Sequence, residues 1–585
     1  MAILRQFDSR SGITYAYDAV YRWDTEKKQS RCKRTLIGRV DPETGEIFPT
    51  DGRMKKRRER LAALAAHAAV SSSTVVSPEV AAPGACASES EQFSAASASS
   101  ASAVTQCSEI VPAIPDRNPL SHRRLFCGAT HLLDCIGEKL GLIDDLRACF
   151  PTFFEQILSI IYYLILEDKN PLYRFEKWGL LHRHPYGENI SSQYSSEIFM
   201  NITEDAIQKF FQLQGRRRME DEHWVYDTTS ISSYSKTLKQ VQYGHNKEDD
   251  KLPQINLALV FGEKSRLPFY YRKLAGNIPD VKTVKILQED LETLNLSGLK
   301  MIMDRGFFSI ENINNMLKEG LNFLISASKS LKFVQKAIDK IWEPIQSFEC
   351  HDEHYKVYSV TVPTEWDGAQ KCEQKESKLS EKHTIYTHVF YSIDKMAEDR
   401  KNMDRNLAQL KDELKSGKHN PENNAQYKKY FKVTTTPENE VQVSAIEENI
   451  RKARRYFGFF TLITDQKMES MEALKLYKNK DVIEKAFGNL KERLNMRRTL
   501  VSSEESLTGK IFVEFVALIY MSYLNKQMQD KGLYKDYTMA TMLDKLDVIE
   551  CVEKTGGGIQ VGEILKKQKD IYEKLGCIPP TSSCV

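Results

Sequence analysis

The sequence lacks the cysteine spacing of a disulfide framework or of a zinc site. Its 11 cysteines are odd in number, are scattered over 585 residues and never form a Cys-x-x-Cys pair. The nearest thing to a cluster of metal ligands, CHDEH at residues 350–354, has no second half, so chance proximity explains it better than a metal site. Reduced, mostly structural thiols are typical of cytosolic proteins, and the class of small disulfide-stapled secreted domains is excluded.

Long apolar runs and an excess of one charge are also missing. The longest apolar stretch, FVEFVALIYMSYL at 512–524, is too short to cross a bilayer and contains Glu514. The first residues do not show the basic, apolar and small-residue order of a secretory signal, so we expect a cytoplasmic protein without a membrane partner. With 83 Lys and Arg against 80 Asp and Glu, the net charge of +3 identifies no partner. The local clusters MKKRRER, GRRR and RKARR are each more typical of a solvated face than of a nucleic-acid contact.

Large apolar side chains are scarce between about residues 70 and 117, where Ser and Ala dominate. Such a segment cannot bury enough surface to offset its chain entropy, so we predict a disordered linker there. A basic helix from about residue 51 to 69 precedes it, and short strands are predicted within residues 13–50. A chain of this length exceeds one compact core, and about two to four domains are expected.

From about residue 119 to 220 the apolar spacing is helical, and Ser191 or Ser192 is a plausible cap of the second helix of a helix-turn-helix. Strands then follow as HWVYDTTSIS, QINLALVFG and LPFYYRKLAG, and the last two are close enough for an antiparallel hairpin. After a helix and a strand ending near Gly306, a helix capped by Ser309 and stopped by Gly320 leads into the strand NFLISA. These elements predict a mixed sheet with helices packed on it.

Residues 331–455 interrupt this core with aromatic strand-like pieces and a highly charged stretch. The strand YFGFFTLITD then resumes it, and the last eighty or so residues read as helices, including one long amphipathic helix from about 504 to 530.

The stretch LYKNKDVIEKAFGNLKERL, residues 476–494, is the most informative of the chain. Tyr477, Lys480, Glu484 and Lys491 follow one another at intervals of three, four and seven residues. At about 100° per residue a continuous helix would place them within an arc of roughly 60°, at the margin of its apolar face. In isolation, an ordinary Lys480–Glu484 ion pair on a solvated face explains the pattern better than a site.

Two aspartates follow predicted strands, Asp227 after HWVY and Asp304 after KMIM. A carboxylate at the end of a buried strand is costly unless it is paired, hydrogen-bonded or bound to metal. Ligands bind at the carboxyl ends of strands in sheets flanked by helices, although a strand-terminal Asp also serves ordinary turns.

Taken together, an Asp on the first strand, an Asp on the fourth and a Glu on a late helix resemble the DDE transposases of bacterial insertion sequences. One subgroup of that family carries Tyr-x2-Arg-x3-Glu-x6-Lys, where this chain reads Tyr477-x2-Lys480-x3-Glu484-x6-Lys491. Lys480 retains the charge of the arginine but loses the planar fork that grips a phosphate. The segments YDTTS, GHNKEDDKLPQINLAL, LAGNIPD and IMDRGFF, and the long insertion before Glu484, are also similar to this group.

The resemblance implies an α/β fold with an RNase H-like catalytic core, a strand-rich insertion and α-helical flanking domains. It implies that Asp227, Asp304 and Glu484 are the catalytic carboxylates and the ligands of two Mg²⁺ ions, with Mn²⁺ as a possible substitute. Asp227 would bridge the ions, while Asp304 and Glu484 would each hold one. Such ions promote in-line displacement at a phosphodiester.

Three further residues are expected at the DNA, with Lys480 and Lys491 neutralising phosphates of the transposon end and the Tyr477 hydroxyl bonding nearby. The partners implied are double-stranded DNA, as transposon ends and target, and a second copy of the chain in a synaptic homodimer. The location implied is the bacterial cytoplasm, at the nucleoid when DNA is bound.

The function implied is that of a transposase that binds the inverted repeats of its own element, cleaves there and transfers the ends to target DNA. Two alternatives remain open: an RNase H-like nuclease without strand transfer, and a catalytically silent DNA-binding protein derived from a transposase. The predicted organisation, in chain order, is a β segment (1–50), a basic helix and linker (51–117), a helical DNA end-binding domain (118–220), the first part of the core (221–330), the insertion (331–455), the second part of the core (456–500) and a C-terminal helical region (501–585).

Overall fold

The computed structural model of the chain describes residues 2–8, 13–24, 29–40, 47–49, 123–218, 222–248, 250–296, 298–366, 368, 379, 382–435, 441–501, 503–553 and 558–582. The chain divides into two compact units, residues 1–112 and 113–585, and each is described by itself. The basic helix and the linker predicted for residues 51–117 lie outside the described residues.

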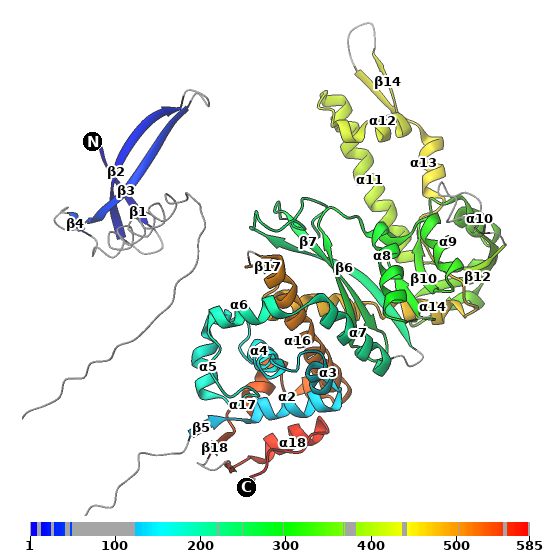
Figure 1. Cartoon of the computed structure of the whole chain (residues 1–585). Helices are drawn as coiled ribbons and strands as arrows, with labels where there is room; N and C mark the ends of the chain where they lie inside the picture. Colours follow the sequence, from blue (N-terminus) through cyan, green and yellow to red (C-terminus); the bar gives the residue numbers. More distant parts are fainter. Residues whose placement is uncertain are drawn as a thin grey trace, which may run out of the picture. The chain divides into compact units, whose positions relative to one another are not determined.

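The first unit contains one antiparallel sheet in the order β1-β2-β3-β4 (Figure 1). Strand β2 agrees with the predicted strand TYAYDAVYRWD within one residue, β3 begins five residues before the predicted RTLIGRVD, and β1 lies outside the predicted strands. Their bounds are β1 (Ala2–Asp8), β2 (Ile13–Asp24), β3 (Gln29–Val40) and β4 (Ile47–Pro49).

The second unit is built around one large mixed sheet. Its order is β11-β12-β13-β16-β10-β9-β6-β7-β8, with β17 paired to β6. The strands β6, β7 and β8 are antiparallel neighbours, β9 and β10 add to β6 in parallel, and β16, β13, β12 and β11 continue the sheet antiparallel. The bounds are β6 (His223–Ser233), β7 (Gln254–Gly262), β8 (Pro268–Ala275), β9 (Lys300–Met303), β10 (Asn322–Ala327), β11 (His351–Asp352), β12 (Val357–Glu365), β13 (Thr384–Tyr391), β16 (Phe459–Thr464) and β17 (Arg498–Thr499).

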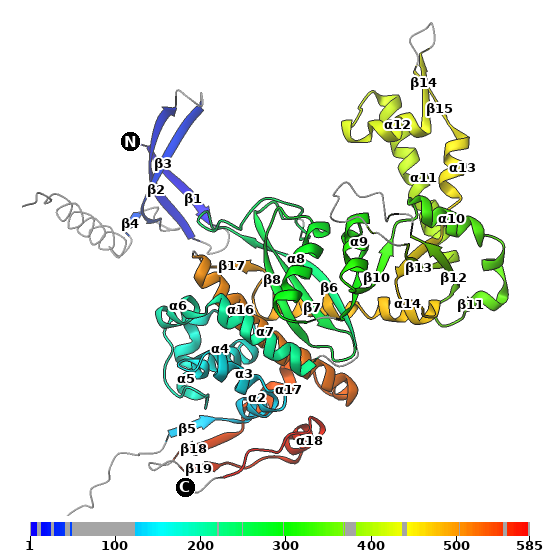
Figure 2. The same cartoon turned by 45° about the vertical axis from the view of Figure 1, so that its right-hand side comes forward.

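The centre of this sheet agrees with the sequence pattern. All nine residues of β7 are buried, as expected for an almost unbroken apolar run covered on both faces, and the predicted hairpin with β8 is confirmed. Two helices, α8 (Asp280–Thr293) and α9 (Ile310–Lys318), cross over between β8, β9 and β10 and pack against each other (Figure 2). The cap of α9 is also confirmed, because the Ser309 hydroxyl accepts a hydrogen bond from the Asn312 amide at 3.0 Å.

The predicted insertion, residues 331–455, does two different things. Its strands β11, β12 and β13 extend the central sheet and α10 (Lys332–Lys340) packs against them, while the segment from α11 to α13 projects from the sheet (Figures 1 and 2). The projecting part has a small core of its own, made by Leu410, Leu414, Tyr427 and Phe431. It consists of α11 (Ile393–Ser416), α12 (Asn424–Tyr430), β14 (Phe431–Thr435), β15 (Val441–Ala445) and α13 (Glu447–Arg454).

The helices before the sheet and those at the end of the chain form one body. Strand β5 (Arg123–Phe126) pairs with β18 (Glu550–Glu553), which pairs with β19 (Ile559–Val561). The cap predicted for α6 is confirmed at Ser191, whose hydroxyl accepts from the Tyr194 amide at 3.1 Å. The helices are α2 (Gly128–Lys139), α3 (Leu142–Cys149), α4 (Phe154–Leu166), α5 (Phe175–Leu181), α6 (Ser192–Asn201), α7 (Glu204–Arg218), α16 (Glu504–Asp530), α17 (Met539–Asp547) and α18 (Lys566–Lys574).

Helix α16 has the bounds predicted for it, but it is not amphipathic. It packs against α4 and α6, and its buried residues lie all around its axis. By length and composition it could cross a membrane, yet 94% of its most apolar 18-residue window is covered by protein. The prediction of an amphipathic helix was wrong because neighbouring helices, rather than solvent, cover its second face.

Candidate active site

Asp227 lies within strand β6. The sequence pattern also predicts that it directly follows a strand ending at Tyr226, and the structure contradicts this prediction. Strand β6 continues to Ser233, but its parallel neighbour β9 ends at Met303, opposite Tyr226. Asp227 is therefore the first residue of β6 beyond the end of β9, and no described strand pairs with that edge again until β17 at Ser232. Its side chain is 23% exposed, which leaves it accessible to a ligand.

Asp304 directly follows β9, as predicted, and starts the one-turn helix η2 (Arg305–Phe307). Its Oδ1 accepts hydrogen bonds from the Arg305 amide at 2.8 Å and from the Tyr477 hydroxyl at 2.6 Å. Its Oδ2 lies 3.2 Å from the Lys480 ammonium. The Asp304 carboxylate thus stabilises its own turn through the Arg305 amide and also binds Tyr477. The contact with Tyr477 joins residues that are 173 positions apart.

The predicted helix 476–494 is not continuous. It consists of α14 (Ser470–Lys478), α15 (Asp481–Gly488) and a π-helical turn, η7 (Asn489–Arg493). The stripe expected on one regular helix is therefore divided over three elements. The wider π turn changes the direction of the residues after Gly488, and π turns occur frequently at functional sites.

This division separates the four residues of the stripe into two groups. Tyr477 and Lys480 both contact Asp304, and the Lys480 ammonium also lies 3.9 Å from the exposed Glu484 carboxylate. Lys491, in the π turn, is instead buried and forms an ion pair with Glu248. The structure brings together Asp304, Tyr477, Lys480 and Glu484 and ties Lys491 to a different carboxylate.

Two residues without a predicted role adjoin Asp227. The Lys247 ammonium lies 3.6 Å from the Asp227 carboxylate and 3.2 Å from that of Asp280. It donates to the backbone carbonyl and to the hydroxyl of Thr228, both at 2.8 Å. Lys247 and Asp280 lie in GHNKEDDKLPQINLAL and LAGNIPD, two segments that resemble the transposase family. The resemblance of these segments did not indicate which of their residues have a role.

The surroundings shift the pKa values of the two aspartates in opposite directions. Burial raises the pKa of Asp227 above its ordinary value, against the opposing charge of Lys247. Burial would also raise the pKa of Asp304, but the hydrogen bonds from Tyr477 and Arg305 and the charge of Lys480 hold it below its ordinary value. Burial and the Asp304 carboxylate raise the pKa of Tyr477, so this hydroxyl remains a donor.

The donor set of the site fits a hard divalent cation in its chemistry. Carboxylate oxygens are the ligands that Mg²⁺ prefers. Both contacts to Asp227 within the described part of the chain use Oδ1, from the Thr228 amide at 2.7 Å and from Lys247, so Oδ2 is available. In this structure two lysines, Lys247 and Lys480, balance the negative charge, and no three His, Cys, Asp or Glu side chains of the described residues lie close enough together to hold a metal ion.

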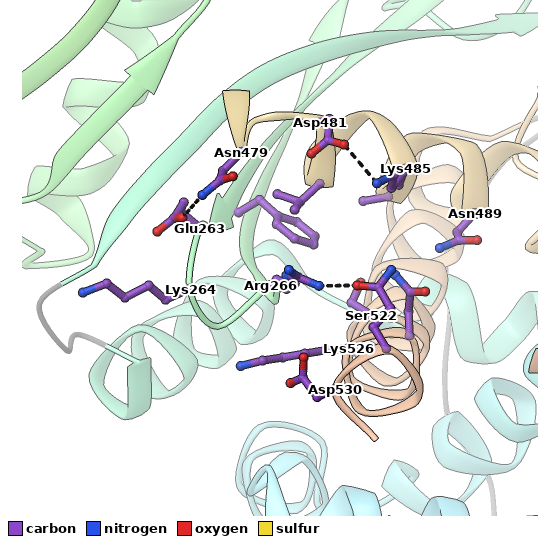
Figure 3. A pocket seen from close by; sticks show the side chains of 15 residues that line it. Glu263, Lys264, Arg266, Asn479, Asp481, Lys485, Asn489, Ser522, Lys526 and Asp530 are labelled. Carbon is purple, nitrogen blue, oxygen red and sulfur yellow. Dashed lines mark hydrogen bonds and ion pairs between the residues drawn. The ribbon is translucent and has the colours of Figure 1, made fainter. Parts of the chain in front are cut away.

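A cavity of about 460 Å³ beside α15 is a different place (Figure 3). It contains none of the six predicted site residues, and Asp481, Lys485 and Asn489 line it instead of Glu484. Its polar side chains largely bind one another, since Asp481 pairs with Lys485, Asn479 with Glu263 and Arg266 with Gln529. We therefore assign the candidate site to the carboxylates at β6 and β9.

A family model and a solved structure are similar to this chain. A family model described as a transposase DDE domain matches residues 218–520, just over half of the chain and a range that contains Asp227, Asp304 and Glu484. No curated protein matches the chain. Among solved structures, the cryo-EM structure of the piggyBac transposase synaptic complex with hairpin DNA is similar at 9% sequence identity, over 78% of this chain and 83% of that chain, with a TM-score of 0.31.

Proposed function

Since this chain belongs to the family of DDE transposase domains, we propose that it binds the terminal inverted repeats of its own insertion sequence, cleaves the DNA ends and transfers them to target DNA. The observation that carries this proposal is the meeting of Asp304 with Tyr477 and Lys480. These contacts join the two halves of the predicted motif across the long insertion, beside Asp227.

The order of the strands supports an RNase H-like core within this proposal. In the run β8-β7-β6-β9-β10, three antiparallel strands come first in sequence, and two strands reached through helical crossovers follow in parallel. The candidate carboxylates then come from the first strand, from the end of the fourth strand and from a later helix. This is the arrangement that the resemblance to transposases of bacterial insertion sequences implies.

In the proposed reaction, Asp227, Asp304 and Glu484 would hold two Mg²⁺ ions, or Mn²⁺ in their place. When bound, the metal would activate the attacking oxygen and stabilise the leaving oxygen of a phosphodiester. The Tyr477 hydroxyl fixes the orientation of Asp304, because it donates to the oxygen that also accepts from the Arg305 amide. Lys480 balances the charges of Asp304 and Glu484. We further propose that Lys480 and Lys491 neutralise phosphates of the transposon end.

The remaining parts of the proposal concern partners and place. Double-stranded DNA is the substrate, and the helical region 118–220 and the basic helix predicted for about residues 51–69 are our candidates for recognition of its ends. Two ends must be brought together, so we propose a homodimer in the synaptic complex. From the Tyr-x2-Lys-x3-Glu-x6-Lys spacing we also propose that the protein belongs to the bacterial subgroup and acts in the cytoplasm, at the nucleoid when DNA is bound.

A supercoiled plasmid that carries the ends of the element tests the function with Mg²⁺ present. The proposal expects strand-transfer products that disappear in Asp227→Asn and in Glu484→Gln while both variants still bind the ends. Cleavage without joining would instead identify a nuclease. Binding of the ends without any cleavage would identify a catalytically silent DNA-binding protein.

A further inference from the structure

The connection between β6 and β7 is fixed along the edge of the site. Near its middle, Gly244 lies against the backbone of Gly276, since a Cβ atom on Gly244 would come within 1.9 Å of the Gly276 carbonyl oxygen. Further on, the Asn246 side chain donates to the Ser232 hydroxyl at 3.2 Å and to the Asp250 carboxylate at 2.6 Å. The two residues that follow Asn246 are thereby presented to the site at defined positions.

Lys247 is held by more contacts than a surface lysine requires. Its ammonium has three donors, of which two bind the carbonyl and the hydroxyl of Thr228. The carboxylates of Asp280 and Asp227 lie 3.2 and 3.6 Å away. The Thr228 hydroxyl also donates to Asp280 at 2.6 Å, which closes a network around the lysine. Two carboxylates share this one cation, so its removal would leave them facing each other uncompensated.

The next residue, Glu248, carries a negative charge, opposite to that of Lys247, and contacts basic residues in and after the π turn. Its carboxylate pairs with the buried Lys491 and lies 3.5 Å from Arg497. Adjacent residues of one connection therefore hold a proposed metal ligand and a proposed phosphate-binding lysine.

We propose that Lys247 is a positioning residue: a resident cation, anchored by Asp280 and Thr228, that holds the Asp227 carboxylate for metal binding. This inference rests on the proposed function, because it takes Asp227 as a metal ligand. The charge of Lys247 also opposes a second cation at Asp227, so the lysine weakens metal binding while it restrains the carboxylate. After removal of Lys247, the Thr228 amide still holds Oδ1, while the restraint by the lysine, its compensation of the two carboxylates and its repulsion of a second cation are lost.

The test uses the full chain with Lys247→Met, Lys247→Arg and a matched control, Lys251→Met, which removes the charge of an exposed lysine in the same connection. Mn²⁺ binding is titrated on the DNA-free protein by the paramagnetic resonance signal of free Mn²⁺, and cleavage of plasmid DNA is measured separately. We expect Lys247→Met to bind Mn²⁺ at least threefold more tightly and to cleave at least tenfold more slowly. Lys247→Arg and Lys251→Met should stay within threefold of the wild type in both measurements.

Mn²⁺ binding by Lys247→Met that is no tighter than wild type would overturn the inference, as would unchanged cleavage. Asp227→Asn separates this failure from failure of the proposed function. Loss of a Mn²⁺ site in Asp227→Asn with unaltered affinity in Lys247→Met overturns the role of Lys247 alone. Unaltered Mn²⁺ binding in Asp227→Asn overturns the metal assignment, and the role of Lys247 with it.

Discussion

At the scale of single residues, Asp304 collects contacts that neither its strand nor its turn requires. Its two oxygens are divided between Tyr477 and Lys480, and both partners come from the junction of α14 and α15. Helical periodicity alone had favoured an ordinary ion pair between Lys480 and Glu484, and that pair exists at 3.9 Å. The shorter contacts to Asp304 could be anticipated only from the motif, because periodicity says nothing about partners from another element.

The hydroxyl of Tyr477 can be tested by Tyr477→Phe, which removes one oxygen and keeps the ring. A hydrogen bond to a charged group contributes about 1.5–3 kcal/mol, so we expect Mg²⁺-dependent cleavage to fall about tenfold or more. The measurement is the initial cleavage rate on a DNA fragment that carries one transposon end, together with binding of that fragment. Tyr534→Phe, which removes a hydroxyl that donates to Asn525 outside the site and outside the proposed end-binding region, is the control and should change neither quantity. A wild-type rate in Tyr477→Phe would contradict the role assigned to this hydroxyl.

Lys480 stands where the related transposases carry arginine, and it contacts both Asp304 and Glu484. We expect Lys480→Arg to cleave at least as fast as the wild type, because a planar guanidinium can donate to both carboxylates or to a phosphate. Lys480→Met should cleave at least tenfold more slowly, and the slope of log K against log salt for DNA binding should become shallower by about 0.9. Lys475→Met, at an exposed lysine of α14, is the matched control. An unchanged salt slope in Lys480→Met would show that this lysine does not contact a phosphate.

At the scale of elements, the local apolar pattern was sufficient to predict the bounds of strands that are buried along their whole length. The strands QINLALVFG and NFLISA have the bounds predicted for them, since continuous apolar runs leave few alternatives. The π turn after Gly488 and the uncovered sheet edge beside Asp227 could not be predicted in the same way. The first depends on how α15 meets the sheet, and the second on where the neighbouring strand β9 stops.

Helix α16 contains a carboxyl group whose surroundings raise its pKa. Glu514 is 1% exposed, and burial raises its pKa from 4.5 to about 7, against the charge of Lys510 at 3.8 Å. Because the folded state binds this proton more tightly than the unfolded state, the contribution of Glu514 to stability is greatest below pH 4.5 and is lost as the pH rises towards about 7. Each unit of such a pKa shift corresponds to about 1.4 kcal/mol.

Glu514→Gln removes the ionisable group and keeps the shape of the side chain. We therefore expect Glu514→Gln to have a higher melting temperature than the wild type at pH 8, with a free energy of unfolding larger by about a few kcal/mol. At pH 5 the difference should be smaller. Thermal unfolding between pH 5 and pH 8, followed by circular dichroism, measures it. Glu505→Gln, at an exposed carboxylate on the same helix, should leave the pH profile unchanged. Parallel profiles for Glu514→Gln and wild type would refute the inference about the buried carboxyl.

At the scale of the whole second unit, segments far apart in sequence form common structures that could not be predicted from local patterns. The sequence suggested a helical domain before the core and a separate helical region after it. In the structure, α16 packs against α4 and α6, and β18 pairs with β5, so both segments share one core. The inserted strands likewise join the central sheet. Such associations depend on which apolar surfaces pack against each other. The local spacing of apolar residues in a single sequence does not indicate this.

The contact between α16 and α6 allows a direct test of this shared core. Gly509 lies in α16, and a Cβ atom there would come within 2.1 Å of the Phe199 carbonyl oxygen at the end of α6. Alanine is intrinsically favoured over glycine in a helix by about 1 kcal/mol, so any loss of stability in Gly509→Ala must come from the clash between the two helices. Separation of packed backbones costs typically 1–3 kcal/mol, and we expect a net loss in that range.

Urea unfolding of the full chain measures the effect, with Gly488→Ala as the matched control. Gly488 ends α15, and a Cβ atom there would meet no other atom within 4 Å, so the control should be neutral or slightly stabilising. If the two helical segments share one core, the clash at Gly509 should destabilise both together, and the unfolding transition of the helical body should remain single and shift to lower urea. A Gly509→Ala variant as stable as Gly488→Ala would mean that α16 does not approach α6 this closely. The N-terminal and C-terminal helices would then be separate domains, as their sequence patterns alone suggest.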